Sequence, residues 1–131
     1  MFNGSWLIKV GNYIIPLSVI QYDTYSSSPA QRQDLDAYRD ADGYMHRNTL
    51  PHTATKIEFE TVPMSLKDFQ ALMGHIRDNY VDGLERKVHL TYYEEEYDQY
   101  REGDFYLPAT MTFNWYTKNI MNSFRIAFIE Y

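Results

Sequence analysis

The sequence predicts a mainly β protein with one α-helix: two packed antiparallel sheets or a β-barrel, flanked by a helix over about residues 65–81. Segments in which apolar and polar residues alternate recur along the chain, a pattern typical of half-buried strands. One stretch alone has apolar residues at spacings of three and four, as on a helix. Because that stretch lies between strand segments, the helix is expected to cover one face or end of the antiparallel sheets.

The length and composition of the chain indicate a single domain and exclude several classes of function. The 131 residues, of which 44% are hydrophobic and 17% aromatic, suffice for one domain spanning 1–131 with its own core. Cysteine is absent, which excludes disulfides, thiolate metal sites and cysteine nucleophiles. The formal net charge of −6 is opposite to that of a nucleic-acid-binding surface, so tight binding of DNA or RNA is not expected. Apolar runs are far shorter than the roughly 20 residues of a membrane span, so no membrane partner is expected.

The chain begins with a predicted β-hairpin. Residues 6–10 and 13–15 are rich in β-forming side chains and flank Gly11-Asn12, a spacing typical of a tight turn. A strand is expected to resume beyond the following proline and to run to about Thr24. Residues 26–29 are predicted as a loop, because serine side chains compete for backbone hydrogen bonds and proline lacks a donor.

A polar segment over about residues 26–50 is predicted to project from the body as a hairpin or loop. Asp42-Gly43 is a turn signal between residues 35–38 and 44–47, and the charges around it place the segment outside the core. Residues 55–62 then alternate strictly between apolar and charged or polar side chains. They are predicted as a half-buried strand.

The predicted helix has a recognisable start and stop. Ser65 followed three positions later by Asp68 resembles a capping box, in which the hydroxyl accepts a hydrogen bond from a free backbone N–H. Gly83 is expected to end the helix in the left-handed conformation. One apolar stripe faces the sheets, and its members are Leu66, Phe69, Met73, Ile76 and Tyr80.

The rest of the chain is predicted as β structure. Residues 88–92 alternate, and residues 94–103 are expected to form an acidic connection that contains tyrosines. Residues 105–116 alternate over a long stretch and are predicted as one continuous strand. Residues 117–119 turn the chain, and residues 124–128 close the fold as a final strand.

No catalytic, cofactor or metal site is predicted. The acidic residues of 94–104 lack the order of a calcium-binding loop, so a solvated loop is favoured over a calcium site. The scattered glycines form no phosphate-binding loop. Three serines lack a nucleophile motif: Ser5, Ser18 and Ser123. Four histidines lack the spacing of zinc ligands: His46, His52, His75 and His89.

The thirteen tyrosines are the unusual feature of the composition. Tyrosine combines a large contact area with a polar end, and it is enriched both at interfaces and in small aromatic cores. The sequence favours neither an interface role nor a core role for these tyrosines over the other. Six of the tyrosines lie within one quarter of the chain: Tyr92, Tyr93, Tyr97, Tyr100, Tyr106 and Tyr116.

Residues 39–47, Arg-Asp-Ala-Asp-Gly-Tyr-Met-His-Arg, followed by Thr-Lys-Ile-Glu-Phe at 55–59, resemble small tail proteins of bacteriophages and related prophages. The likeness spans nearly the whole chain and rests on the order of elements. In that order come a first hairpin, a D-x-x-G loop with an arginine, a K-I-x-F strand, one helix, a tyrosine-rich strand and a terminal hairpin. Gly11-Asn12 reverses the Asn-Gly-like order of the family's first turn.

The resemblance implies a tail-tube type of fold, in which subunits form hexameric rings around a lumen. It implies a non-enzymatic structural subunit of the tail tube, distal tail or baseplate, made in the bacterial host cytoplasm and located in the virion. The implied partners are other copies of the chain and neighbouring tail proteins, with DNA passing through without tight binding. The polar hairpin would contact the next ring, so the candidate assembly residues are Tyr38, Asp40, Gly43, Tyr44 and Arg47.

The sequence leaves two other functions open. The alternative is a monomeric β-sandwich binding module whose surface tyrosines contact carbohydrate, which predicts a tyrosine-lined groove and measurable sugar affinity. A glycosidase ranks third and predicts two carboxylates that face each other across a cleft, roughly 5 to 10 Å apart. The tail subunit predicts rings or tubes and no sugar affinity.

Overall fold

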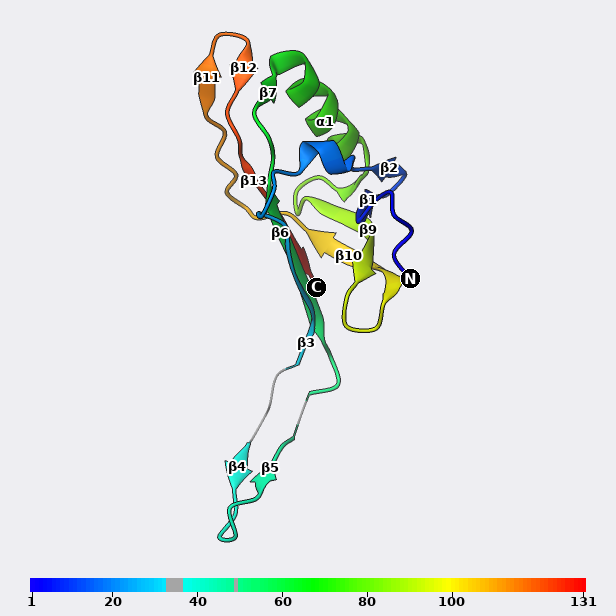
Figure 1. The fold of residues 1–131 in the computed structure, drawn as a ribbon, viewed down its shortest axis with the longest axis vertical. Coiled ribbons are helices and arrows are strands. Elements are labelled where there is room, and N and C mark those ends of the chain that lie inside the picture. Colours follow the sequence, from blue (N-terminus) through cyan, green and yellow to red (C-terminus); the bar gives the residue numbers. More distant parts are fainter. Residues whose placement is uncertain (33–36, 49) are drawn as a thin grey trace.

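The computed structural model describes residues 1–32, 37–48 and 50–131. Figure 1 shows an elongated molecule, with a body of sheets and one helix above a thin hairpin. In chain order the elements are β1 (Ile8–Val10), β2 (Tyr13–Ile14), the 3-10 helix η1 (Leu17–Val19), β3 (Ser26–Gln31), β4 (Tyr38–Arg39), β5 (Met45–His46), β6 (Ala54–Glu60), β7 (Met64–Ser65), α1 (Leu66–Asp78), β8 (Tyr80–Asp82), β9 (Lys87–Glu94), β10 (Gln99–Tyr106), β11 (Trp115–Thr117), β12 (Ile120–Met121) and β13 (Arg125–Glu130).

The strands form three antiparallel sheets. The main sheet has eight strands in the order β2-β1-β9-β10-β13-β6-β3, with β8 paired to β9. A three-stranded sheet has the order β11-β12-β7, and β4 pairs only with β5. The predicted class, mainly β with one α-helix, is confirmed. The barrel alternative is wrong, because in the described residues the main sheet ends at two separate edges, β2 and β3, that do not pair with each other.

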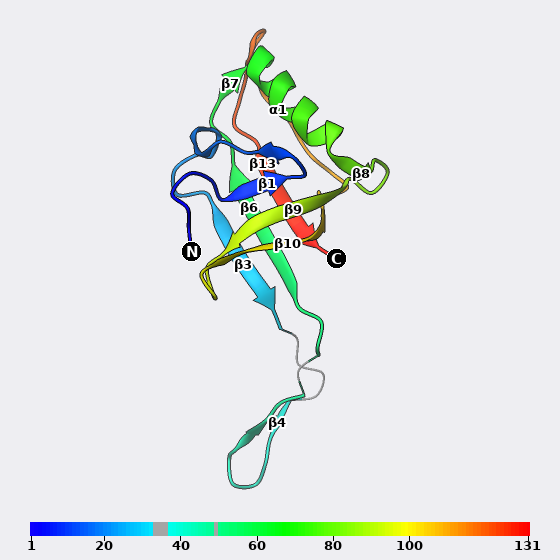
Figure 2. The same ribbon diagram turned by 90° about the vertical axis from the view of Figure 1, so that its right-hand side faces the viewer.

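The main sheet bends sharply between β10 and β13. These strands pair at only two positions, Phe105 with Glu130 and Tyr106 with Ile129. Away from these two pairs, β9 and β10 cross β6 and β13, as Figure 2 shows. The inner faces of the two halves of the main sheet, on either side of the bend, meet in one apolar core. Helix α1 lies over one end of this core, where it buries Leu72 and Ile76.

Local pattern predicted several of these elements. β1 and β2 form the expected hairpin around Gly11-Asn12, and β6 buries Ile57 and Phe59. β9 and β13 also lie where alternation placed strands. The hydroxyl of Ser65 accepts a hydrogen bond from the backbone N–H of Asp68 at 3.2 Å, so the predicted cap of α1 is confirmed.

The helix ends earlier than predicted. Its last residue is Asp78, and residues 80–82 form β8 instead of a further helical turn, so Gly83 is not the stop. The side chain of Asn79 explains the end: its Nδ2 donates to the carbonyl of His75 at 2.8 Å, and its Oδ1 accepts from the N–H of Asn12 at 3.1 Å. These bonds fasten the helix terminus to the first hairpin.

Two predictions for residues 17–31 are wrong. Residues 17–24 contain no strand: Pro16 caps the 3-10 helix η1, and only an isolated bridge joins Ile20 to Thr61. Residues 26–31, predicted as a loop at their start, form strand β3. The backbone of β6 supplies hydrogen-bonding partners for β3, and an edge position tolerates Pro29.

The acidic connection and the long strand near the C-terminus are also corrected. Residues 99–103 belong to β10, so the acidic connection is only a short turn over 95–98. Residues 107–114 are not a strand, because Pro108 removes a donor and the chain leaves the sheet there. The apolar residues in this segment, including Phe113, pack against α1 and the core; the Phe113 ring centroid lies 5.3 Å from that of Phe69.

Within the described residues no helix has the length and apolarity to cross a bilayer.

Candidate assembly interface

Residues 37–48 form a hairpin, called the arm below, that extends away from the body (Figure 1). Strands β4 and β5 pair through Tyr38 with His46 and Arg39 with Met45, and the turn at Asp42-Gly43 lies between them as predicted. The first predicted strand of this hairpin began at residue 35, and residues 35 and 36 lie outside the described ones. All five candidate assembly residues of the sequence are therefore brought together in one element.

The carboxylate of Asp40 organises the turn of the arm. Its Oδ1 accepts hydrogen bonds from the N–H groups of Asp42 at 2.9 Å and Tyr44 at 3.0 Å. Its Oδ2 lies 2.8 Å from Nε2 of His46. The bond to His46, followed by those from the backbone, holds the pKa of Asp40 below its usual value, because each favours the charged form. The turn is fixed by contacts within the arm itself.

Gly43 and two side chains complete the arm. Gly43 has φ +87°, which favours glycine, and its carbonyl accepts from the guanidinium of Arg39 at 2.9 Å. The ring of Tyr38 stacks on that of His46, with centroids 4.9 Å apart and planes 12° from parallel. Arg47 follows β5 with an exposed side chain. Asp40 and Gly43 thus build the turn.

The arm presents apolar side chains to solvent. The exposed fractions are 72% for Tyr44, 54% for Tyr38 and 48% for Met45. Side chains of this size are usually covered, and exposed clusters of them commonly mark interaction sites. The arm is a hydrogen-bonded hairpin that displays an aromatic and methionine surface.

The open edges of the sheets are the second feature suited to assembly. β3 ends the main sheet, but Pro29 has no N–H and the N–H of Ala30 donates to the hydroxyl of Thr55 at 3.0 Å. β11 ends the three-stranded sheet and exposes Trp115 and Tyr116. Unpaired edges are templates for pairing with another chain.

The tyrosines of β9 and β10 are engaged within the chain. Tyr92 is buried, and the Tyr93 hydroxyl donates to Oδ1 of Asp98 at 2.5 Å, a bond that raises the pKa of Tyr93 to about 12. The Tyr100 hydroxyl donates to the carbonyl of Trp6 at 2.8 Å. Tyr93 and Tyr100 meet edge to face, with centroids 5.6 Å apart. These rings fasten the N-terminal segment to β9 and β10.

The acidic segment begins inside the protein. The side chain of Glu94 is 1% exposed and pairs with the guanidinium of Arg101, although neither carboxylate oxygen receives a well-aligned hydrogen bond. Arg101 also lies over the ring of Tyr97, 5.3 Å from its centroid. Glu96 pairs with Arg32 at 3.1 Å. Among the described residues no three carboxylates or histidines are grouped as metal ligands.

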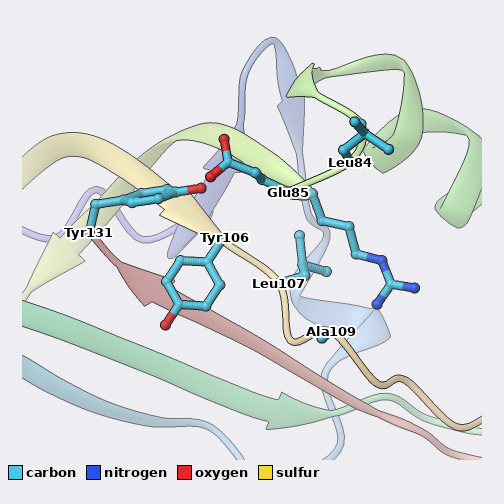
Figure 3. Close-up of a pocket in the computed structure, with 8 residues that line it drawn as sticks. Leu84, Glu85, Tyr106, Leu107, Ala109 and Tyr131 are labelled. Atoms are coloured by element: carbon cyan, nitrogen blue, oxygen red, sulfur yellow. The ribbon is translucent and has the colours of Figure 1, made fainter.

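A hollow of about 520 Å³ lies between the turn at residues 83–86, the end of β10 and Tyr131. Figure 3 shows the carboxylate of Glu85 directed at the Tyr131 hydroxyl. The pKa of Tyr131 is raised by burial and then by Glu85. Glu85 is the one carboxylate among the described lining residues, so this hollow lacks the acid pair of a glycosidase.

A second hollow, of about 320 Å³, contains both Glu58 and Glu60. Glu58 is held by the guanidinium of Arg125, which lowers the pKa of that carboxyl. A glycosidase acid needs the opposite shift, toward a raised pKa. Glu58 is therefore not suited to be the acid of a glycosidase.

A family model described as "Family of unknown function (DUF6711)" matches the chain over residues 1–131. The chain belongs to this family. No curated protein matches this DUF6711 chain. Among solved structures it is similar to a chain from the "Tail of empty GTA particle computed with helical refinement, C6 symmetry". The TM-score is 0.54 at 13% sequence identity, and the alignment covers 100% of this chain and 94% of that chain. This likeness shows the fold.

Sequence reasoning missed one exposed cluster of this DUF6711 chain. Trp115, Tyr116 and Ile120 are 56%, 69% and 40% exposed on the β11–β12 hairpin. Trp115 lies in the predicted strand over residues 105–116, two positions after Phe113, so strict alternation puts both on one face. The available signal was the polar turn at residues 117–119, because aromatic residues beside a surface turn need not belong to a core.

Proposed function

We propose that the chain is a non-enzymatic structural subunit of a bacteriophage-type tail, as a tube, distal-tail or baseplate component. It assembles into a homo-oligomeric ring, hexameric in stoichiometry, and contacts neighbouring tail proteins. The observation that carries the proposal is the fold likeness along the entire chain to a protein in the C6-symmetric tail of a GTA (gene transfer agent) particle. Closed rings of identical subunits are a common outcome of head-to-tail interfaces.

The arm and the open edges support this function. An ordered hairpin that extends from the body incurs a conformational entropy cost, and a binding partner offsets that cost. Unpaired edges such as β3 and β11 gain hydrogen-bonding partners when subunits pair. The candidate assembly residues Tyr38, Asp40, Gly43, Tyr44 and Arg47 act here by shaping and presenting the arm.

The charge of the subunit fits a conduit. A net charge of −6 repels phosphate, so DNA passes through the ring without tight binding. The subunit is made in the host cytoplasm and located in the virion.

The first test is the oligomeric state of the purified chain. Light scattering across a concentration series, with negative-stain imaging of the same samples, is expected to give rings of six times the 15.6 kDa subunit mass. A variant in which residues 37–48 are replaced by Gly-Ser-Gly is expected to keep the far-UV circular dichroism of the body and to lose contacts between rings. A strict monomer at every concentration that also binds carbohydrate would refute the proposal and favour the binding module.

A further inference from the structure

The two ends of the long axis both expose apolar side chains. The arm lies at one end, and α1 with the β11–β12 hairpin, residues 115–121, lies at the other (Figure 1). The arm exposes Tyr44 and Met45, whereas the β11–β12 hairpin exposes Trp115 and Tyr116. A surface that projects at one end and a different apolar surface at the opposite end suit a heterologous contact between copies.

The β11–β12 hairpin is held in place by the body. Ile120 pairs with Ser65 of β7, and Met121 beside it is buried. The carbonyl of Asn119, in the turn, accepts from the N–H of Leu66 at the first residue of α1, at 2.8 Å. The surface is therefore organised before any partner binds, which reduces the entropy cost of binding.

The two turns carry opposite charges. The arm turn has the exposed Asp42, and the β11–β12 turn has the exposed Lys118. Among the described residues, neither Asp42 nor Lys118 has an ion-pair partner. The other charged side chains of the arm take part in hydrogen bonds or electrostatic interactions. Opposite charges on two surfaces guide their encounter and set their register.

We infer that the β11–β12 hairpin of one copy receives the arm of a second copy, with Lys118 facing Asp42 and Trp115 and Tyr116 packing against Tyr44 and Met45. Each copy then offers an arm at one end and a receptor at the other, so the contact repeats along an axis and does not close. The inference rests on the proposed function, in which the arm is an assembly surface, and it names the surface that the arm contacts.

The absence of cysteine allows a direct test by cross-linking. Purified D42C and K118C variants are mixed under mild oxidation; a disulfide requires Cα atoms about 4.4 to 6.8 Å apart. A covalent dimer of one D42C and one K118C chain is expected. The control mixes D42C with E102C, whose cysteine replaces an exposed residue on β10. Both chains of this mixture are expected to remain monomeric on non-reducing electrophoresis. Equal yields of dimer from both mixtures would overturn the inference.

Charge reversal separates this contact from ring formation. D42K and K118E are each expected to weaken association between rings by about tenfold, because like charges then face each other. The D42K/K118E double variant restores the opposite pair and is expected to recover association, with single rings unchanged throughout. If ring formation and association between rings are the same in all three variants as in the wild type, this inference is overturned and the proposed function still stands. A wild-type chain that forms no rings, together with D42C and K118C variants that form no cross-link, would overturn both.

Discussion

The contact between Gly11 and Asn79 predicts a large effect from the addition of one methyl group. In G11A the new Cβ would lie 2.3 Å from Oδ1 of Asn79, closer than any ordinary contact, at a backbone φ of +57°. The left-handed conformation costs alanine about 1 kcal/mol. Displacing Asn79 loses its bonds to Asn12 and His75, each worth about 1 kcal/mol. Lower entropy of the unfolded chain offsets about 0.5 kcal/mol, leaving a destabilisation of about 2 to 3 kcal/mol.

Urea denaturation followed by tryptophan fluorescence measures this effect. With a slope of about 2 kcal/mol per molar urea, the midpoint of G11A is expected to fall by about 1 to 1.5 M. The matched control is G4A, since Gly4 has φ +80° but nothing within 4 Å of the added Cβ, and it isolates the conformational cost of about 1 kcal/mol. If G11A and G4A destabilise equally, or if N79A does not reduce the cost of G11A, the reasoning is refuted.

Three further predictions concern the interior, the helix and the arm. R101L is expected to lower the free energy of unfolding by about 2 kcal/mol, because it leaves Glu94 buried without its partner. The loss is smaller than for a fully buried ion pair, since Arg101 is partly exposed, and an unchanged denaturation midpoint would contradict it. S65A is expected to cost about 1 kcal/mol through loss of the helix cap, with S65D as the variant that keeps an acceptor and the same denaturation experiment as the measurement. The pKa of Asp40 is lowered in the folded arm, so its carboxylate stabilises the turn above the ordinary pKa of about 3.9, and this contribution is lost as the pH falls through the lowered value. The amide resonance of Tyr44 should report that transition by NMR, and D40N should abolish it; a transition that persists in D40N would show that another group is responsible.

The strands that could be predicted are those whose alternation reflects burial on one side of a paired ladder. β6 and β9 have this property, and the Ser65 cap of α1 is equally local, because its partner lies three residues away. β3 could not be predicted from its serines, because its hydrogen bonds go to β6, about thirty residues further along the chain.

The alternation between residues 107 and 114 predicted a strand for a different reason. Leu107, Met111 and Phe113 face inward, as the pattern requires, but they pack against the core without a neighbouring strand. Periodicity reports which side chains face inward and not whether the backbone is paired. The same limitation hid the exposure of Trp115.

The candidate interface was partly accessible from sequence. Asp42-Gly43 predicted the turn of the arm, and the charges around it predicted a position outside the core. The role of Asp40 as an acceptor for two backbone N–H groups depends on the turn's three-dimensional geometry, so the sequence marked the residue without its function.

The irregular edge of β3 limits how the protein can aggregate. A foreign strand added beside β3 finds no donor at Pro29 and a donor already committed at Ala30, so a continuous ladder is confined to residues 26–28. Three residues are too few to hold an arbitrary chain, and amyloid-like growth along this edge is disfavoured. This edge is therefore selective: an arbitrary chain gains little there, while a partner with matching contacts elsewhere still gains from residues 26–28.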